Sequence, residues 1–377
     1  MHKITTKQTY TLFTLALFSP LIRLTPALGA RLAGQAGWVS FFVSCAVFCG
    51  LIILYGNYFR NKNHTDLYLL YKSAFGKVIT IILVLCYAVW VFALVGFYLR
   101  AFAERFAGII MPGVPAEFFM ITLLGLVFVI LSGRFQSFAL MSGLLFYLVL
   151  FALSVVFVLQ IPRISPENLL PVTHLDAENI LHGVLPTLGV FAYITPLLFL
   201  GSGMMCEDKT KFRKYGVYSA LVLLAVNLMV FMMTVGVFGA RLTEEMHRPF
   251  MMSVKTVGAQ GALERLESIF LLLWVVTDLA IIVMLMHVLL KLMSFLTLSE
   301  KPEVFKSLLL SGVFVFALWI IRDVNEMEEL SLNIGLPLNL IMGFAVPVAA
   351  IVVCKIKGAF SSHPSPPDTP PTTPEQS

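Results

Sequence analysis

The chain has 377 residues, of which 59% are hydrophobic and only 12% are charged, and its mean hydropathy is +0.90. Soluble domains are about 45–50% apolar and about 25% charged. This composition therefore excludes a soluble enzyme, a nucleic-acid-binding module and a disordered chain. It predicts that the main partner of the protein is the lipid bilayer, and no nucleic-acid partner is expected.

Apolar stretches of about 20 residues, the length that crosses a bilayer core of roughly 30 Å, follow one another along the chain. Each is expected to be a helix, because lipid offers no partner for an unpaired backbone group. The pattern predicts an all-α polytopic membrane protein with about ten spans over residues 1–360. The expected spans are residues 10–30, 37–58, 77–103, 116–132, 137–161, 181–203, 215–239, 265–290, 304–321 and 331–356.

The tail, residues 361–377, is rich in Pro, Ser and Thr and is expected to be disordered. The lysines indicate the orientation, because positive residues are enriched on the cytosolic side of membrane proteins. Thirteen of the fourteen lysines fall at the N-terminus, in even-numbered connections or near the C-terminus, and only Lys255 falls elsewhere. Both termini are therefore expected to face the cytosol.

No motif in the sequence indicates a cofactor, a metal ion or a catalytic function. The chain lacks a Walker loop, a GxSxG elbow, an HExxH pair and a clustered set of His and Cys. The five cysteines include no CxxC pair and are expected to be free thiols. We therefore expect a protein that is not an enzyme and that holds neither a cofactor nor a metal.

Two expected spans contain residues that interrupt helices. Span 1 contains Pro20 and Pro26, and span 6 contains Pro186, Gly189 and Pro196. These spans come first in each set of five, and an odd number of spans per half gives the two halves opposite orientations. Such a pair is typical of transporters built from inverted repeats, so we expect a five-plus-five bundle with helices 1 and 6 broken at a binding site. Simple kinks without a site are the alternative.

Residues at the two expected breaks are the candidates for ligand binding, because they are small or can form hydrogen bonds. Small-molecule sites combine an apolar wall with a few well-placed polar groups. The candidate residues are Ser19, Thr25, Ala192, Tyr193 and Thr195.

Charged residues inside the spans form a second set of candidates. Asp278 lies well inside span 8 and Arg23 lies in span 1. A carboxylate at the membrane centre costs about 2.5–3.5 kcal/mol and needs a partner, a proton or water. We expect Arg23 and Asp278 to pair, directly or through water; the alternative is that Arg23 extends outward and Asp278 is protonated. Arg100 and Glu104 are four residues apart and are expected to form a local ion pair.

Several motifs together resemble the B-subunit family of endospore germinant receptors, a branch of the amino acid–polyamine–organocation transporters. The resemblance covers the whole chain up to the tail. The motifs that carry it are Leu24-Thr-Pro26 with Ala33-Gly-Gln-Ala-Gly-Trp38, Asn168-Leu-Leu-Pro171, Phe199-Leu200 before the basic loop Lys209–Lys214, Pro249 ahead of Glu264-Arg-Leu-Glu267, and Trp274.

The resemblance implies a ten-helix inverted-repeat bundle of the kind found in amino acid transporters. It implies a receptor subunit in the inner membrane of a spore that senses a germinant, usually an amino acid such as L-alanine. The implied partners are an A subunit and a lipoprotein C subunit. Two alternatives stay open: an autonomous secondary transporter for amino acids or polyamines, coupled to protons through Asp278, and a structural partner that only holds the A subunit.

Overall fold

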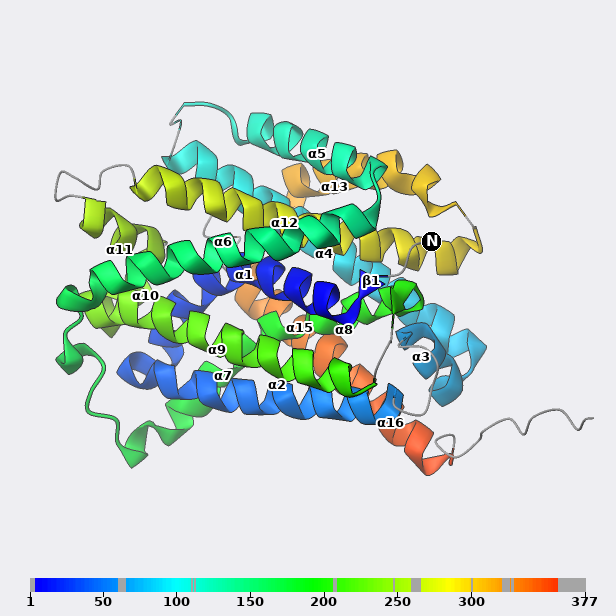
Figure 1. The fold of residues 1–377 in the computed structure, drawn as a ribbon, viewed down its shortest axis with the longest axis horizontal. Helices are drawn as coiled ribbons and strands as arrows, with labels where there is room; N and C mark the ends of the chain where they lie inside the picture. The colour runs from blue at the N-terminus through cyan, green and yellow to red at the C-terminus, as the bar shows by residue number, and fades with distance from the viewer. Residues whose placement is uncertain are drawn as a thin grey trace, which may run out of the picture.

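The computed structural model describes residues 4–59, 66–109, 111, 113–205, 209–246, 248–258, 266–299, 301–320, 326 and 329–358. The expected tail, Cys206 and the first two residues of the Glu264-Arg-Leu-Glu267 motif lie outside these ranges. Long helices lie side by side along the longest axis of the molecule, with the N-terminal helix in their midst (Figure 1). This arrangement confirms the all-α polytopic class.

The first half of the chain contains six α-helices and one short 3₁₀ turn among the described residues. In chain order these are α1 (Thr6–Ala33), η1 (Gly34–Ala36), α2 (Gly37–Phe59), α3 (Leu67–Phe75), α4 (Lys77–Ile109), α5 (Ala116–Ser132) and α6 (Phe135–Gln160).

The second half begins with three short 3₁₀ turns and continues with helices to the last described residues. The elements are η2 (Ile161–Arg163), η3 (Pro166–Asn168), η4 (His174–Asp176), α7 (Ala177–Phe191), α8 (Ile194–Leu197), η5 (Leu198–Gly203), α9 (Lys209–Phe238), α10 (Ala240–Glu245), α11 (Pro249–Gly258), α12 (Leu266–Thr297), η6 (Pro302–Phe305), α13 (Lys306–Ile320), the π-helical turn η7 (Ser331–Gly335), α15 (Leu336–Leu340), the π-helical turn η8 (Ile341–Ala345) and α16 (Val346–Ile356).

A short parallel pairing joins the N-terminal segment to the segment between η5 and α9 at one end of the bundle. Strand β1 (Ile4–Thr5) pairs with β2 (Met204–Met205), with Ile4 opposite Met204. The end of α16 lies at this same end of the bundle, whereas α10 and α11 lie at the other (Figure 1).

Seven helical stretches in the described part of the chain are long and apolar enough to cross a membrane, and the first of them, Thr6–Phe59, contains both α1 and α2. Helix α5 is apolar but shorter. Each of the ten expected spans coincides with a helical segment. The number of crossings and the inverted repeat stay predictions.

Helix 1 corrects one expectation, because α1 runs as a single helix through Pro20 and Pro26. A proline removes one backbone donor, and the freed groups are tolerated inside a membrane protein where surrounding protein satisfies them. Here α1 is covered on several sides by α6, α7, α9 and α12, and the Thr25 hydroxyl donates to the Leu21 carbonyl oxygen at 2.7 Å. The helix therefore stays continuous inside a dense packing of neighbouring helices.

Helix 6 is interrupted, as expected. Helix α7 ends at Phe191, and a turn at Ala192 and Tyr193 separates it from α8. Across this turn the backbone changes to tighter bonding: the Tyr193 amide donates to the Val190 carbonyl at 3.3 Å, and the Thr195 amide donates to the Ala192 carbonyl at 3.0 Å. Bonds to the third preceding residue are typical of 3₁₀ structure, which often marks a functional hinge.

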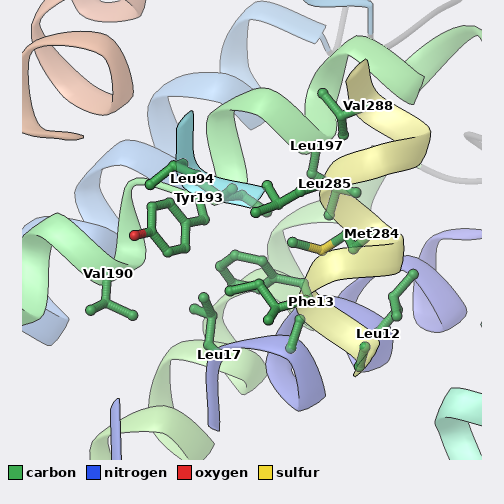
Figure 2. Packing of buried hydrophobic residues seen from close by; sticks show 14 of the residues in the cluster. Leu12, Phe13, Leu17, Leu94, Val190, Tyr193, Leu197, Met284, Leu285 and Val288 are labelled. Carbon is green, nitrogen blue, oxygen red and sulfur yellow. The ribbon is translucent and has the colours of Figure 1, made fainter. Parts of the chain in front are cut away.

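The core around this interruption is densely packed. Buried residues of α1, α8 and α12, among them Phe13, Leu197 and Met284, belong to one apolar cluster. The Tyr193 ring lies beside this cluster, and its hydroxyl points away from α12 (Figure 2). The interruption therefore holds the Tyr193 ring in the core and directs the Tyr193 hydroxyl away from α12.

Candidate functional site

A partly open cavity of about 240 Å³, called the inner cavity, lies between α1, α4, α7, η7 and α15. Most of its wall is apolar, including Leu28, Leu94 and Phe97, and its polar groups include Arg23 and Tyr193. Such a pocket, with an apolar wall and a few polar groups, is typical of a small-molecule site.

Three wall residues of the inner cavity, Trp90, Tyr193 and Asn339, form a hydrogen-bonded cluster with Tyr98. The Trp90 indole N–H donates to Asn339 Oδ1 at 2.9 Å, and Asn339 Nδ2 donates to the Tyr193 hydroxyl at 3.2 Å. The Tyr98 hydroxyl also donates to the Tyr193 hydroxyl, at 2.9 Å. Because Tyr193 accepts two bonds, its own O–H proton is left to donate to another group.

An outer cavity of about 120 Å³ lies at the end of the bundle near α10 and α11. Its wall is more polar and includes Glu104, Glu244 and Arg248. The two cavities share Arg23, Leu24, Leu28 and Ser331 as wall residues. Arg23 therefore borders both cavities.

The Arg23 guanidinium is held by aromatic rings. Its central carbon lies 4.6 Å from the Phe97 ring centroid and 5.7 Å from that of Tyr98. Its Nε and Nη2 atoms are buried and have no hydrogen-bond partner.

Asp278 forms an ion pair with Arg105 of α4. Its other carboxylate oxygen accepts a hydrogen bond from the Ser19 hydroxyl, which also accepts a bond from the Trp274 indole N–H at 3.3 Å. The direct Arg23–Asp278 pair is therefore not the arrangement observed, since the partner of Asp278 is Arg105 and Arg23 faces aromatic rings. A contact through water stays a prediction.

The five candidate ligand residues are distributed over different surroundings. Tyr193 lines the inner cavity, and Ser19 belongs to the Asp278 cluster. Thr25 bonds within its own helix, and Ala192 is fully buried in the interruption. The Thr195 hydroxyl donates to the Gly343 carbonyl at 2.7 Å and accepts a bond from the Tyr55 hydroxyl at 2.9 Å. Only Tyr193 of the five is among the residues that line a described cavity.

Sequence reasoning missed Arg105 and Asn339 as site residues. We expected span 3 to end at residue 103, but α4 continues to Ile109, so that Arg105 lies within the helix. The signal was a second arginine close to the Arg100–Glu104 pair in a mostly apolar helix, since charged residues at such depth need a partner. Asn339 carries no comparable local signal, since single amides are common packing groups.

The polar groups near the outer cavity behave as the sequence predicts in one respect. Arg100 and Glu104 form an ion pair at 2.7 Å, which confirms the expected local contact. Arg248, outside the spans, donates to the Glu104 carbonyl oxygen at 3.1 Å, and burial lowers the pKa of Arg248 from its ordinary value.

In the described part of the chain, no group of three or more His, Cys, Asp or Glu side chains could hold a metal ion.

Long apolar helices packed around buried charges and an internal cavity define a multi-pass α-helical membrane protein. A family model described as spore germination protein, that of the spore permeases, matches residues 3–327. The match covers most of the chain, so the chain belongs to the spore permease family of spore germination proteins, and the resemblance seen in the sequence is confirmed. No curated protein matches the chain.

Proposed function

We propose that the chain is the integral membrane subunit of a spore germinant receptor and that it senses a small germinant, an amino acid, in the inner cavity. It acts together with A and C subunits in the spore inner membrane, with both termini in the cytosol. Membership of the spore permease family supports the role in germination. The observation that carries the sensing role is the inner cavity of about 240 Å³ with Arg23, Tyr193 and Asn339 on its wall.

The size and wall of the inner cavity support a ligand of this class. An apolar cavity of about 150 Å³ is large enough for benzene, so about 240 Å³ is enough for a small amino acid with an apolar side chain. Because the wall is mostly apolar, its few polar groups would decide which end of the ligand lies where.

The position of the inner cavity offers a way to pass a signal to the rest of the protein. Its wall includes residues on both irregular segments, Tyr193 at the interruption of helix 6 and Gly335 in the π-helical turn η7. A ligand that binds one arrangement of these segments more tightly than another shifts the population toward that arrangement. Such a shift would change the surface presented to the A and C subunits.

The test uses spores that carry the full receptor and a single variant of this chain. Tyr193→Phe removes one hydroxyl from the inner cavity, and Tyr147→Phe, at an exposed position of α6, is the matched control. We expect Tyr193→Phe to shift the amino acid concentration for half-maximal germination by about tenfold, the equivalent of one good hydrogen bond. The control should leave the dose response unchanged.

Two results would contradict the proposed function. The first is an unchanged response to every amino acid in spores from which this chain has been deleted. The second is uptake of labelled amino acids by proteoliposomes that contain this chain alone, which would favour the autonomous transporter. The bonding of both Asp278 oxygens, to Ser19 and to Arg105, argues against that alternative, because it engages the carboxylate expected to carry the proton.

A further inference from the structure

The guanidinium of Arg23 has one unused edge. Its Nε and Nη2 atoms, which are buried and lack hydrogen-bond partners, are adjacent on the same side of the planar group. A buried donor without an acceptor is unfavourable, and two on a permanently charged group are more so. An acceptor with two suitably spaced atoms along this edge would satisfy both donors.

A carboxylate has the geometry that this edge requires. Its two oxygens lie in one plane and accept two parallel N–H bonds from an arginine, which makes the pair both strong and directional. The Phe97 and Tyr98 rings, with centroids 4.6 and 5.7 Å from the guanidinium carbon, restrict the orientation of Arg23 in advance. A ligand therefore meets a guanidinium that is already positioned.

Tyr98 connects Arg23 to a second hydrogen-bond donor, the Tyr193 hydroxyl. The Tyr98 ring lies beside Arg23, and the Tyr98 hydroxyl donates to that of Tyr193. Since Tyr193 also accepts a bond from Asn339, its remaining polar function is to donate its own proton. Both Arg23 and Tyr193 line the inner cavity as donors, and no Asp or Glu is among the wall residues of that cavity.

The described Asp and Glu side chains near the two cavities either form ion pairs with other arginines or line only the outer cavity. Asp278 pairs with Arg105, and Glu104 pairs with Arg100. Glu244 and Glu245 line the outer cavity only. The remainder of the inner wall, including Leu94 and Val190, is apolar and suits an uncharged body.

We propose that the inner cavity binds a small carboxylate with an apolar body, and that the carboxylate lies along the Nε–Nη2 edge of Arg23 and accepts the Tyr193 O–H. The proposal rests on the proposed function for its biological role and adds to it the chemical class and the orientation of the ligand. Arg23 then selects carboxylates among ligands of the same size, because an ester or an amide has no negative charge to place along its Nε–Nη2 edge.

The experiment measures binding to the purified full chain in phosphatidylcholine–phosphatidylglycerol nanodiscs. The probes are L-alanine, L-leucine and L-phenylalanine, each compared with its own amide, which keeps the size and removes the carboxylate. A ligand that binds only the folded protein raises the midpoint of thermal unfolding with its concentration. We expect at least one amino acid to raise the midpoint and its amide to have no effect at the same concentration.

Variants of two arginines test whether Arg23 is the residue that binds the carboxylate. Arg23→Gln should weaken the apparent affinity at least tenfold, and Arg23→Lys should retain part of it, because lysine keeps the charge without the two-donor edge. Arg134→Gln, which replaces an exposed arginine before α6, is the matched control and should bind as the unmodified chain does.

The results that would overturn the proposal are specific. They are binding of an amide as tight as that of its amino acid, unchanged affinity in Arg23→Gln, and no shift with any of the three amino acids. The germination response of variant spores distinguishes failure of the carboxylate assignment from failure of the proposed function. If Arg23→Gln spores respond normally while deletion of the chain abolishes the response, the receptor role stands and the carboxylate assignment fails.

Discussion

Asp278 of α12 and Arg105 of α4 form an ion pair inside the bundle, with side chains that are 1% and 4% exposed. The Ser19 hydroxyl of α1 donates to the same carboxylate. The Arg105 guanidinium lies over the Trp274 ring, with its central carbon 4.0 Å from the ring centroid. Three helices that are distant in sequence are thus joined at one charged cluster.

The first prediction concerns this pair. Removing one member leaves the other buried and uncompensated, which costs about 3–5 kcal/mol. We expect Asp278→Asn and Arg105→Gln each to lower the unfolding midpoint strongly, and the double variant to be more stable than the sum of the two losses predicts. Thermal unfolding of the purified chain measures this coupling.

The control for the ion-pair prediction is Glu104→Gln. Its pair with Arg100 has a glutamate side chain that is 22% exposed, so we expect a smaller loss than for either member of the Asp278–Arg105 pair. Strict additivity of the Asp278 and Arg105 variants would show that the two side chains do not stabilise one another.

The second prediction concerns pH and Asp66, which lies outside the spans at the start of α3. Its carboxylate accepts a hydrogen bond from the Tyr68 amide at 2.9 Å. Burial raises the pKa of Asp66 from 3.8 to about 6, opposed by the Tyr68 bond and by the charge of Lys291. The folded protein therefore binds the proton more tightly than the unfolded chain does.

The stabilising proton on Asp66 is fully present below about pH 4 and is lost as the pH rises through about 6. The unmodified chain should therefore lose up to about 3 kcal/mol of stability over this range relative to Asp66→Asn. Asparagine keeps the helix cap and cannot ionise. Parallel pH profiles of the unfolding midpoint for the two proteins would refute this prediction.

The third prediction separates Thr195 from Thr25. Thr195→Val leaves the Tyr55 hydroxyl and the Gly343 carbonyl without their partner, and we expect a loss of about 1–3 kcal/mol. Thr25→Val removes only a bond to the Leu21 carbonyl in its own helix, so its loss should be smaller. Unfolding midpoints test the order, and a larger loss for Thr25→Val would contradict it.

The fourth prediction concerns the contact of η8 with the interruption of helix 6. A Cβ atom at Gly343 would meet the Ala192 side chain and lie 2.8 Å from the Ala192 Cα atom. Gly343→Ala must therefore push η8 away from the interruption and should cost about 1–3 kcal/mol. Gly125→Ala, at an exposed position of α5 with open space around it, should be neutral or stabilising. Equal unfolding midpoints for the two variants would contradict this close approach.

Features that depend on neighbouring residues were predictable from the sequence. The apolar runs predicted the helical segments, because length and hydropathy alone decide whether a helix suits a bilayer. The interruption after Phe191 followed from the proline and glycine content of span 6. The Arg100–Glu104 pair followed from a spacing of four residues, which places two side chains on one helical face.

Features that depend on how helices pack were decided only by the tertiary structure. Pro20 and Pro26 occur in a continuous α1, which is surrounded by other helices. Asp278 pairs with Arg105 of α4, since the rotation of each helix decides which side chains meet, and rotation leaves no mark on hydropathy. The same packing makes Tyr193 the one proposed ligand residue on the inner cavity wall and directs the other four to contacts within the protein.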